Sequence, residues 1–283
     1  MTTINGGVNN FGGTNSFYGP VSGHDITMAA ARSGPDAALA EIGVLTVIDE
    51  EMRAVKAVLA GMDGYRTRRL GDGPLAHEAR LTGLDGRPLR IVAVQTLTRG
   101  TESAALACRA LVEAYGPGTV LLVGIAGGVA EDVKIGDVVV ADNVISYDAR
   151  KVTPEGVRHR GQAQVVPAAL GHRLNEFFAD EPRPAFGIHR GPIGSGNAVV
   201  ADPAAEIRRW LYHVNDKVLA VETEAAGVAQ SFHETSRLPG WLTIRGISDT
   251  ADRSKNDDDH EVAARHAAEV MAMLVPFLDF RSS

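Results

Sequence analysis

Carboxylate side chains follow three separate apolar segments of this 283-residue chain. The segment 241–247 leads into Ser248 and Asp249, and the segments 218–221 and 42–48 also lead into acids. Side chains at the carboxyl ends of strands commonly line the binding crevice of α/β proteins. Carboxylates beside a hydroxyl can donate and accept protons, so the pattern indicates an enzyme that handles protons and hydroxyl groups. The acids concerned are Asp49, Glu50, Glu51, Glu222, Glu224 and Asp249.

Strand and helix patterns alternate over the part of the chain that carries these acids. Continuous apolar runs predict strands, and apolar residues spaced three and four apart predict helices between them. Strands that are apolar on both faces are typical of sheets covered by helices. We therefore predict an α/β fold with a mixed, largely parallel central sheet flanked by helices. Predicted strands cover residues 42–48, 76–81, 89–97, 119–125, 136–142, 188–193, 218–221 and 241–247, and predicted helices cover 49–62, 103–115, 225–236 and 258–278.

Residues 1–40 differ in composition from the remainder, 41–283, which we expect to form the catalytic domain. The segment 4–26 is rich in Asn and Gly, almost uncharged, and carries isolated apolar residues. Such a segment cannot bury a core, which predicts a disordered leader. Asn-rich segments can also stack into cross-β ladders, and residues 4–26 resemble the short amyloid-signalling motifs of bacterial and fungal immune proteins. A plain leader and a motif for self-assembly or for binding a partner protein both stay open.

Composition excludes several other classes of protein. Hydrophobic residues make up 45% of the chain. The formal net charge is −7, and this negative charge argues against a nucleic-acid polymer as partner. The single cysteine, Cys108, excludes an internal disulfide and suits a reducing cytoplasm. Residues 1–40 lack the pattern of a secretion signal, and no apolar stretch approaches the roughly 20 residues that span a bilayer. We expect a cytoplasmic protein with no membrane partner.

Several motifs resemble those of the purine nucleoside phosphorylase and nucleosidase superfamily. They follow one another in the order expected of that superfamily and extend over residues 42–278. Among its branches, the methylthioadenosine/adenosylhomocysteine nucleosidases have the most similar opening strand and acids. The matching segments are 42–51, the glycine turn 123–128 (Val-Gly-Ile-Ala-Gly-Gly), the strand 134–139, the base-pocket segment 194–197 (Gly-Ser-Gly-Asn), the ribose-binding segment 222–226, and 245–249 with the catalytic Ser-Asp.

The resemblance implies cleavage of an N-glycosidic bond, with roles for particular acids. Asp249, held protonated by burial, would donate a proton to N7 of the departing purine, and Ser248 would orient its carboxyl group. Glu224 would accept hydrogen bonds from the ribose 2′- and 3′-hydroxyls, and Glu51 would bind and polarise the attacking water. Each acid also has a simpler explanation. Asp249 could cap a following turn, and the two glutamates could lie favourably at helix N-termini.

Other positions bear on the sugar and the base. The resemblance places Ala126 and Gly127 where the backbone approaches the sugar or the water, although a tight turn explains the glycine almost as well. Thr223 stands where the nucleosidases usually have a methionine under the ribose. Val199, followed by Val200, stands where they stack a phenylalanine on adenine, and loss of that ring removes about 1–3 kcal/mol of stacking. Methylthioadenosine therefore cannot be assumed as the substrate.

Basic side chains cluster between residues 147 and 160 of this acidic chain. A charged loop is commonly a solvated face. Guanidinium and ammonium groups also bind phosphates, so the segment predicts a nucleotide substrate such as AMP or ATP. The chain also resembles the branch of the superfamily used as nucleotide-depleting effectors in bacterial defence. The proposed phosphate-binding residues are Arg150, Lys151, Arg158 and Arg160.

Water is the expected nucleophile, because the superfamily's phosphorylases carry two phosphate-binding elements that do not match here. Residues 49–51 replace their Gly-Asp-Pro-Xaa-Arg loop, and the apolar run 120–123 replaces an arginine before the glycine turn. Arg99 is the one stray candidate for a phosphate ligand.

No cofactor is expected, and no His/Cys/Asp cluster has metal-ligand spacing. The resemblance implies a homo-oligomer, at least a dimer, that acts on a small purine nucleoside or nucleotide. A metabolic methylthioadenosine/adenosylhomocysteine nucleosidase, a phosphate-dependent phosphorylase and a non-catalytic nucleotide-binding module stay open as alternatives.

Overall fold

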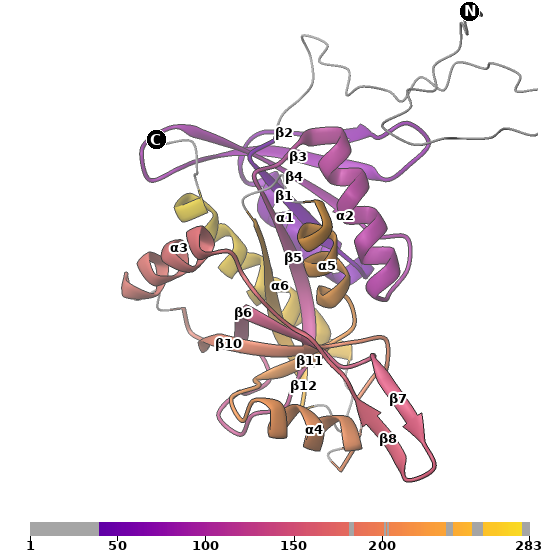
Figure 1. The fold of residues 1–283 in the computed structure, drawn as a ribbon. Helices are drawn as coiled ribbons and strands as arrows, with labels where there is room; N and C mark the ends of the chain where they lie inside the picture. Colours follow the sequence, from indigo (N-terminus) through magenta and orange to yellow (C-terminus); the bar gives the residue numbers. More distant parts are fainter. Residues whose placement is uncertain are drawn as a thin grey trace, which may run out of the picture. The chain divides into compact units, whose positions relative to one another are not determined.

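A mixed β-sheet forms the centre of the chain in the computed structural model (Figure 1). The structure describes residues 40–180, 184–200, 202, 204–235, 240–250 and 257–278, so the predicted leader lies outside the described residues. The strands are β1 (Ile42–Thr46), β2 (Asp63–Arg69), β3 (Leu75–Thr82), β4 (Pro88–Gln95), β5 (Thr119–Gly128), β6 (Val138–Ser146), β7 (Arg150–Thr153), β8 (Gly156–His159), β9 (Ala163–Val165), β10 (Ile188–Ser195), β11 (Ala220–Glu222) and β12 (Gly240–Asp249). The helices are α1 (Asp49–Ala60), α2 (Thr101–Tyr115), α3 (Ala168–Ala179), α4 (Glu206–Val214), α5 (Ala225–Thr235) and α6 (Asp257–Leu274), followed by the 3₁₀ helix η1 (Val275–Leu278).

The order of the strands closes one half of the sheet on itself. Neighbours run β11-β10-β6-β12-β5-β1-β4-β3-β2, and β11 also pairs with β5. The strands β5, β12, β6, β10 and β11 therefore form a closed ring. Pairing is parallel from β4 through β1 and β5 to β12, and again from β6 through β10 to β11. Antiparallel strands complete the sheet, which confirms the predicted mixed α/β class.

The central strands are apolar because both of their faces are covered. Every residue of β1 and of β12 is buried. Helix α1 packs against α6, and α2 packs against α5. These packings are close: a Cβ placed on Gly246 of β12 would lie 1.9 Å from the carbonyl oxygen of Ala263 in α6. A Cβ on Gly227 of α5 would lie equally close, 1.9 Å, to the carbonyl oxygen of Thr101 in α2.

The structure contains elements that apolar patterns did not predict. Strand β2 is mostly exposed and pairs only with β3, so its sequence carries no apolar run. The hairpin β7–β8, the short strand β9 and helices α3 and α4 were also not predicted. Strand β5 continues three residues beyond the predicted end at 125, because residues 127 and 128 pair with β11. The glycines expected in a turn therefore lie in a strand.

The length and polarity of the helices bear on membrane insertion. None of the described helices is both long enough and apolar enough to cross a bilayer.

Candidate active site

One pocket lies where β1, β5, β11 and β12 end, beside the start of α5. It gathers the ends of elements that are far apart in the sequence, as expected for strands whose carboxyl ends meet at one edge of a sheet. Four of the residues that line it are acids, and eight have aliphatic side chains. The lining residues are Val47, Ile48, Glu51, Arg99, Ile125, Ala126, Gly127, Tyr147, Ala198, Val199, Val200, Val221, Glu222, Thr223, Glu224, Ser248, Asp249 and His260.

Ser248 and Asp249 enter the pocket at a bulge in β12. Ile247 pairs with Ala126 and Asp249 with Gly127, so two residues of β12 advance against one of β5. A bulge interrupts the alternation of side chains along a strand, which lets neighbouring residues point to the same region. The Ser248 hydroxyl lies 3.1 Å from Asp249 Oδ2 and donates to it, and both side chains are buried.

Glu51 joins the start of α1 to the end of β5. Its Oε2 accepts the backbone N–H groups of Val47 at 2.7 Å and Ile48 at 3.1 Å, and its Oε1 accepts that of Ile125 at 2.9 Å. Burial raises the pKa of Glu51, while Arg245 and the three N–H donors act in the opposite direction. The glutamate therefore caps α1, as the helix-terminus explanation expected, and also lines the pocket.

Glu224 is held between two segments of the chain. Its Oε1 accepts the Gly100 N–H at 3.0 Å and the Thr223 hydroxyl at 2.5 Å. Gly100 precedes α2 with φ = 105°, a left-handed conformation that favours glycine. The threonine in place of methionine thus contacts the proposed ribose-binding carboxylate directly.

Glu222 fixes the turn between β11 and α5. Its carboxylate accepts the backbone N–H of Glu224 at 3.1 Å and of Ala225 at 3.0 Å. Burial raises the pKa of Glu222, Arg245 lowers it, and the nearby Glu224 raises it further. The carboxylate therefore positions its neighbour Glu224 through the backbone.

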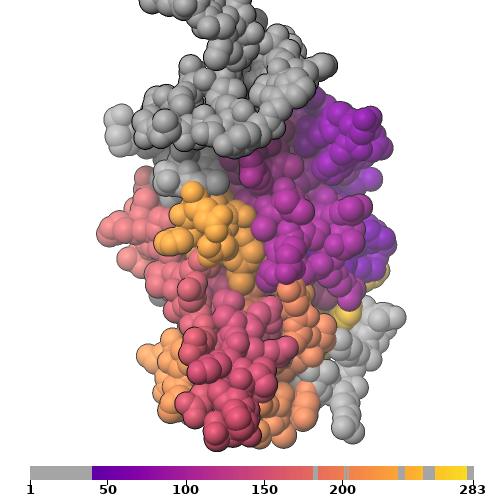
Figure 2. Space-filling model, turned by 45° about the vertical axis from the view of Figure 1, so that its right-hand side comes forward, coloured from indigo at the N-terminus to yellow at the C-terminus, as the bar shows by residue number. Residues whose placement is uncertain are grey.

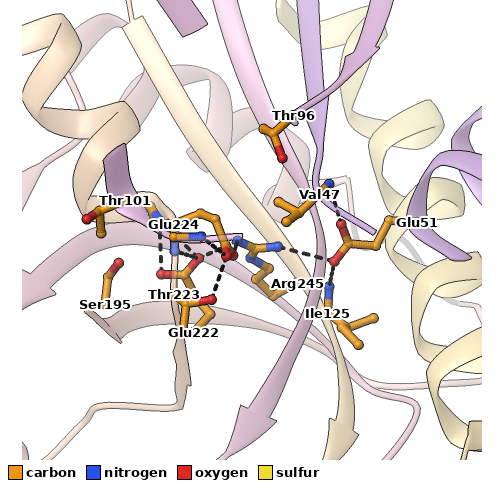
Figure 3. A network of polar contacts seen from close by, with 12 residues as sticks. Val47, Glu51, Thr96, Thr101, Ile125, Ser195, Glu222, Thr223, Glu224 and Arg245 are labelled. Atoms are coloured by element: carbon orange, nitrogen blue, oxygen red, sulfur yellow. Dashed lines mark hydrogen bonds and ion pairs between the residues drawn. The ribbon is translucent and has the colours of Figure 1, made fainter. Parts of the chain in front are cut away.

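Arg245 lies at the centre of these glutamates (Figure 3). Its Nη2 donates to Glu222 and to Glu224, the latter at 3.0 Å, and its Nη1 lies 3.6 Å from Glu51 Oε1. Burial acts to lower the pKa of Arg245, but the three carboxylates outweigh this effect and raise it, so the guanidinium stays charged. Arg245 does not itself line the pocket and acts behind the acids that do.

Gly124 makes room for this ion pair. A Cβ at this position would lie 2.2 Å from Arg245 Nη1 and 2.2 Å from Glu51 Oε1. The first glycine of the segment 123–128 is thus required by the buried charges. Ala126 and Gly127, which were expected beside the sugar or the water, do line the pocket.

The segment after β10 forms one wall of the pocket. Val199 and Val200, the first of which was matched to the phenylalanine that the nucleosidases stack on adenine, line the pocket, and Val199 is 65% exposed. Tyr147 supports this wall from below: its hydroxyl donates to the carbonyl oxygens of Ala198 at 2.8 Å and Gly196 at 3.0 Å.

A sequence profile decides the family of this chain. The profile of the phosphorylase superfamily matches residues 41–278, nearly the whole of the described part. The chain belongs to the phosphorylase superfamily. The superfamily predicted from the sequence motifs is thereby confirmed.

Curated relatives within the phosphorylase superfamily are nucleosidases. The chain is 27% identical over 256 residues to the ATP nucleosidase Cap17 of Escherichia coli strain KTE188, which covers 81% of this chain and 50% of that protein. It is 30% identical over 240 residues to the 5′-methylthioadenosine/S-adenosylhomocysteine nucleosidase of Psychromonas ingrahamii, which covers 83% of this chain and 96% of that protein. The chain thus spans about half the length of the Cap17 relatives.

Solved structures of the superfamily share this fold. The 5′-methylthioadenosine/S-adenosylhomocysteine nucleosidase of S. pneumoniae, bound to a transition-state inhibitor, has a TM-score of 0.69 and 25% identity, covering 84% of this chain and 99% of that one. The futalosine hydrolase of Helicobacter pylori has a TM-score of 0.66 and 23% identity, covering 84% of this chain and 97% of that one. The latter supports the fold alone.

The four basic residues proposed for phosphate binding do not belong to the pocket lining. Arg150, Lys151 and Arg158 belong to the exposed hairpin β7–β8, and Arg160 follows it. None of the four lines the pocket. Arg150 lines a separate groove with residues of α2 and α5, which lie side by side on the face seen in Figure 2. Phosphate binding by this hairpin remains a prediction.

Five pocket or support residues were not among the site residues proposed from the sequence. Arg245 carried a signal: it is the one charged residue within the apolar strand 240–247, and a cation there requires buried partners. The other four are Arg99, Tyr147, Glu222 and His260. Of these, Glu222 follows the apolar segment 218–221 and Arg99 was noted as a stray phosphate candidate, whereas Tyr147 and His260 carried no such signal.

Proposed function

We propose that this member of the phosphorylase superfamily hydrolyses the N-glycosidic bond of a purine nucleoside or nucleotide of the adenine type, releasing the free base. One observation carries the proposal: Glu51, Glu224 and Asp249, buried and from three separate strand ends, line a single pocket. Three buried acids cost considerable free energy of folding, which a merely structural pocket would not require.

Asp249 is the proposed proton donor. When the bond between ribose C1′ and purine N9 breaks, its electron pair passes into the purine, and a proton on N7 neutralises the departing base. Ser248, which donates to Asp249 Oδ2 at 3.1 Å, would hold the carboxyl group in one orientation. General acid catalysis of this kind contributes about 10²–10⁴ in rate.

Glu224 and Glu51 are the proposed partners of the sugar and the water. Two ribose hydroxyls can donate to one carboxylate, and the Gly100 and Arg245 contacts fix Glu224 for that task. The water oxygen forms the new bond to C1′, and Glu51 binds this water and takes its proton. Arg245 positions both glutamates by contacting them from behind.

Relatives support the adenine-type substrate. The curated proteins named above are an ATP nucleosidase and a methylthioadenosine/adenosylhomocysteine nucleosidase, and each name includes an adenine nucleoside or nucleotide. A second candidate is therefore the methylthioadenosine/adenosylhomocysteine reaction itself. The apolar side chains of Val47 and Ile48 in the pocket lining favour it, since an alkylthio group is apolar.

The decisive experiment is chromatographic detection of free base. The purified chain is incubated with adenosine, methylthioadenosine, AMP and ATP, in buffer with and without inorganic phosphate. We expect release of adenine without phosphate, and about 10²–10⁴-fold slower release by Asp249→Asn, which cannot donate the proton. An absolute requirement for phosphate would instead identify a phosphorylase. The hydrolysis proposal fails if no purine is released, or if Asp249→Asn is as active as the wild type.

Three further expectations stay predictions alongside this function: a homo-oligomer, association through residues 4–26, and a role in antiviral defence. Deletion of residues 1–28 tests the second. Unchanged assembly and unchanged partner binding of the truncated chain would reject an associating leader.

A further inference from the structure

One arginine and one histidine line a pocket whose other charged residues are all acids. Arg99 lies between β4 and α2 and is exposed, whereas Glu51, Glu224 and Asp249 are buried. Among the described residues that line the pocket, Arg99 is the only lysine or arginine. His260, near the start of α6, is half-buried. The pocket therefore has an acidic interior and a cation where it opens to solvent.

The Arg99 side chain is an exposed arginine that lines the pocket and, unlike Arg53 and Arg109, has no carboxylate partner among the described residues. Arg53 pairs with Glu50 at 3.0 Å, and Arg109 pairs with Glu113 at 2.8 Å. Arg99 forms no hydrogen bond and no ion pair with any residue in the described part of the chain. No described residue therefore occupies its five N–H donors, which can bind a ligand in the pocket.

The loop that carries Arg99 is fixed on both sides. The Thr96 hydroxyl donates to the Thr98 carbonyl oxygen at 2.9 Å, and the Thr98 N–H donates to the Ser103 hydroxyl at 3.2 Å. The next residue, Gly100, donates its N–H to Glu224 at 3.0 Å. Arg99 is therefore adjacent in sequence to a group that holds the proposed ribose carboxylate.

We infer that Arg99 binds a phosphate on the 5′ carbon of the nucleoside and makes nucleotides the preferred substrate class. The inference rests on the proposed function for the position of the nucleoside. With the ribose hydroxyls on Glu224 and the base beside Asp249, the 5′ substituent is the part of the substrate left to reach the exposed rim. A guanidinium binds phosphate oxygens in pairs, and the His260 ring can donate a further hydrogen bond.

The negative charge of the chain and of the pocket explains why a phosphorylated substrate needs a cation such as Arg99. The chain has a net charge of −7, and four of its carboxylates line the pocket close to the proposed substrate position. An anionic substrate is repelled by both, so its binding requires a local cation. A homocysteine tail carries an ammonium group as well as a carboxylate, and this ammonium group would be repelled by Arg99. A phosphate carries no positive charge.

The test measures a selectivity ratio. The value of kcat/KM is determined with AMP, ATP and adenosine for the wild type and for Arg99→Gln. We expect the ratio of AMP to adenosine to fall by about 10- to 100-fold in Arg99→Gln, the size of one lost charge-assisted contact. Arg99→Lys should recover part of the ratio, because it keeps the charge but not the paired donors.

Two sets of variants serve as controls. Arg109→Gln removes the same charge from an exposed position on α2 and should leave the ratio within about threefold of the wild type. Lys151→Gln and Arg158→Gln, cross-strand partners in the hairpin, test the competing phosphate site. A fall in the ratio for the hairpin pair, with none for Arg99→Gln, overturns the inference. Thermal unfolding of each variant shows whether it is folded.

Failure of the inference is separable from failure of the proposed function. If adenine is released but the wild type prefers adenosine or methylthioadenosine to AMP, the function stands and the inference is wrong. If no base is released from any substrate, the inference is tested by binding instead. Calorimetry then gives the Kd values of AMP and adenosine for the wild type and for Arg99→Gln. An unchanged ratio of the two Kd values rejects it, and a fall of about 10-fold or more supports it.

Discussion

At the scale of single residues, the site depends on one buried cation. Arg245 is fully buried and contacts three glutamates, so its charge offsets part of the cost of burying theirs. Removing one partner from such a group leaves unpaired charges in the interior, which commonly costs about 3–5 kcal/mol. Gly124 belongs to the same arrangement, since only a residue without a side chain leaves space for the guanidinium and Glu51.

In the proposed reaction, Glu51 is expected to set the acid side of the pH dependence. Burial raises its pKa above the ordinary value of 4.5. Glu51 must be ionised to take a proton from water, so lowering the pH through the raised pKa removes activity. We expect log(kcat/KM) to fall on the acid side with an apparent pKa above 4.5, measured by base release across a pH series.

The neighbouring Glu50 provides the matched control for that pH profile. Glu50 is partly exposed, pairs with Arg53 and does not line the pocket. Glu50→Gln should leave the acid limb in place, whereas Glu51→Gln should lower the rate by about 10²–10⁴-fold and abolish the limb. An acid limb that persists in Glu51→Gln would show that another group takes the proton.

At the scale of elements, the bulge in β12 and the packing of α6 behind it place Ser248 and Asp249. Strand β12 approaches α6 so closely at Gly246 that a Cβ there would lie 1.9 Å from the Ala263 carbonyl oxygen and 2.5 Å from its carbonyl carbon. Gly246→Ala must therefore push the helix away from the sheet. We expect it to lower the free energy of unfolding by about 1–3 kcal/mol or more, measured by urea denaturation.

Gly171 offers the contrasting glycine substitution. It lies within α3, where an added Cβ meets no atom within 4 Å. Gly171→Ala should raise the free energy of unfolding by about 0.5–1 kcal/mol, because alanine loses less conformational entropy in a helix. A Gly246→Ala variant as stable as Gly171→Ala would mean that the β12–α6 contact is looser than described.

At the scale of the whole molecule, the ring of β5, β12, β6, β10 and β11 brings the acids of distant segments to one pocket.

The single cysteine reports on the integrity of the helical layer outside this sheet. Cys108 of α2 is 1% exposed, and burial raises the pKa of its thiol to about 12. Cys108 therefore serves as a small buried apolar side chain.

Labelling of Cys108 should require unfolding. A thiol reagent at neutral pH reacts with exposed thiolate, so the native protein should react at least about 1,000-fold more slowly than the denatured chain. Leu106→Cys introduces a control thiol on the same helix, at a position that is 70% exposed. Mass spectrometry should find one rapidly labelled thiol in that variant. Equal rates for both thiols would show that α2 opens readily in the folded protein.

The sequence predicted those strands and helices whose apolar pattern is visible in neighbouring residues. The buried strands β1, β4, β5 and β12 were found because continuous apolar runs follow from burial on both faces. Strand β2 and the hairpin β7–β8 were missed because exposed residues face no such constraint. Glu51, Glu224 and Asp249 were singled out because each lies within three residues after a recognisable strand.

Contacts between distant segments were decided only by the tertiary structure. The sequence indicated the family, the α/β class and the acids, since motifs and burial patterns are written in neighbouring residues. It did not indicate that Arg245 would join three glutamates, because this depends on strand order and on the pairing of β11 with β5. It named Arg99 only as a stray candidate beside four cations at residues 150–160, and it did not indicate which of these lines the pocket. Arg99 does so through the loop after β4, while the richer cluster of charge lies on an exposed hairpin. Charge density along a chain does not report distance in space, and the closure of the strand ring sets those distances.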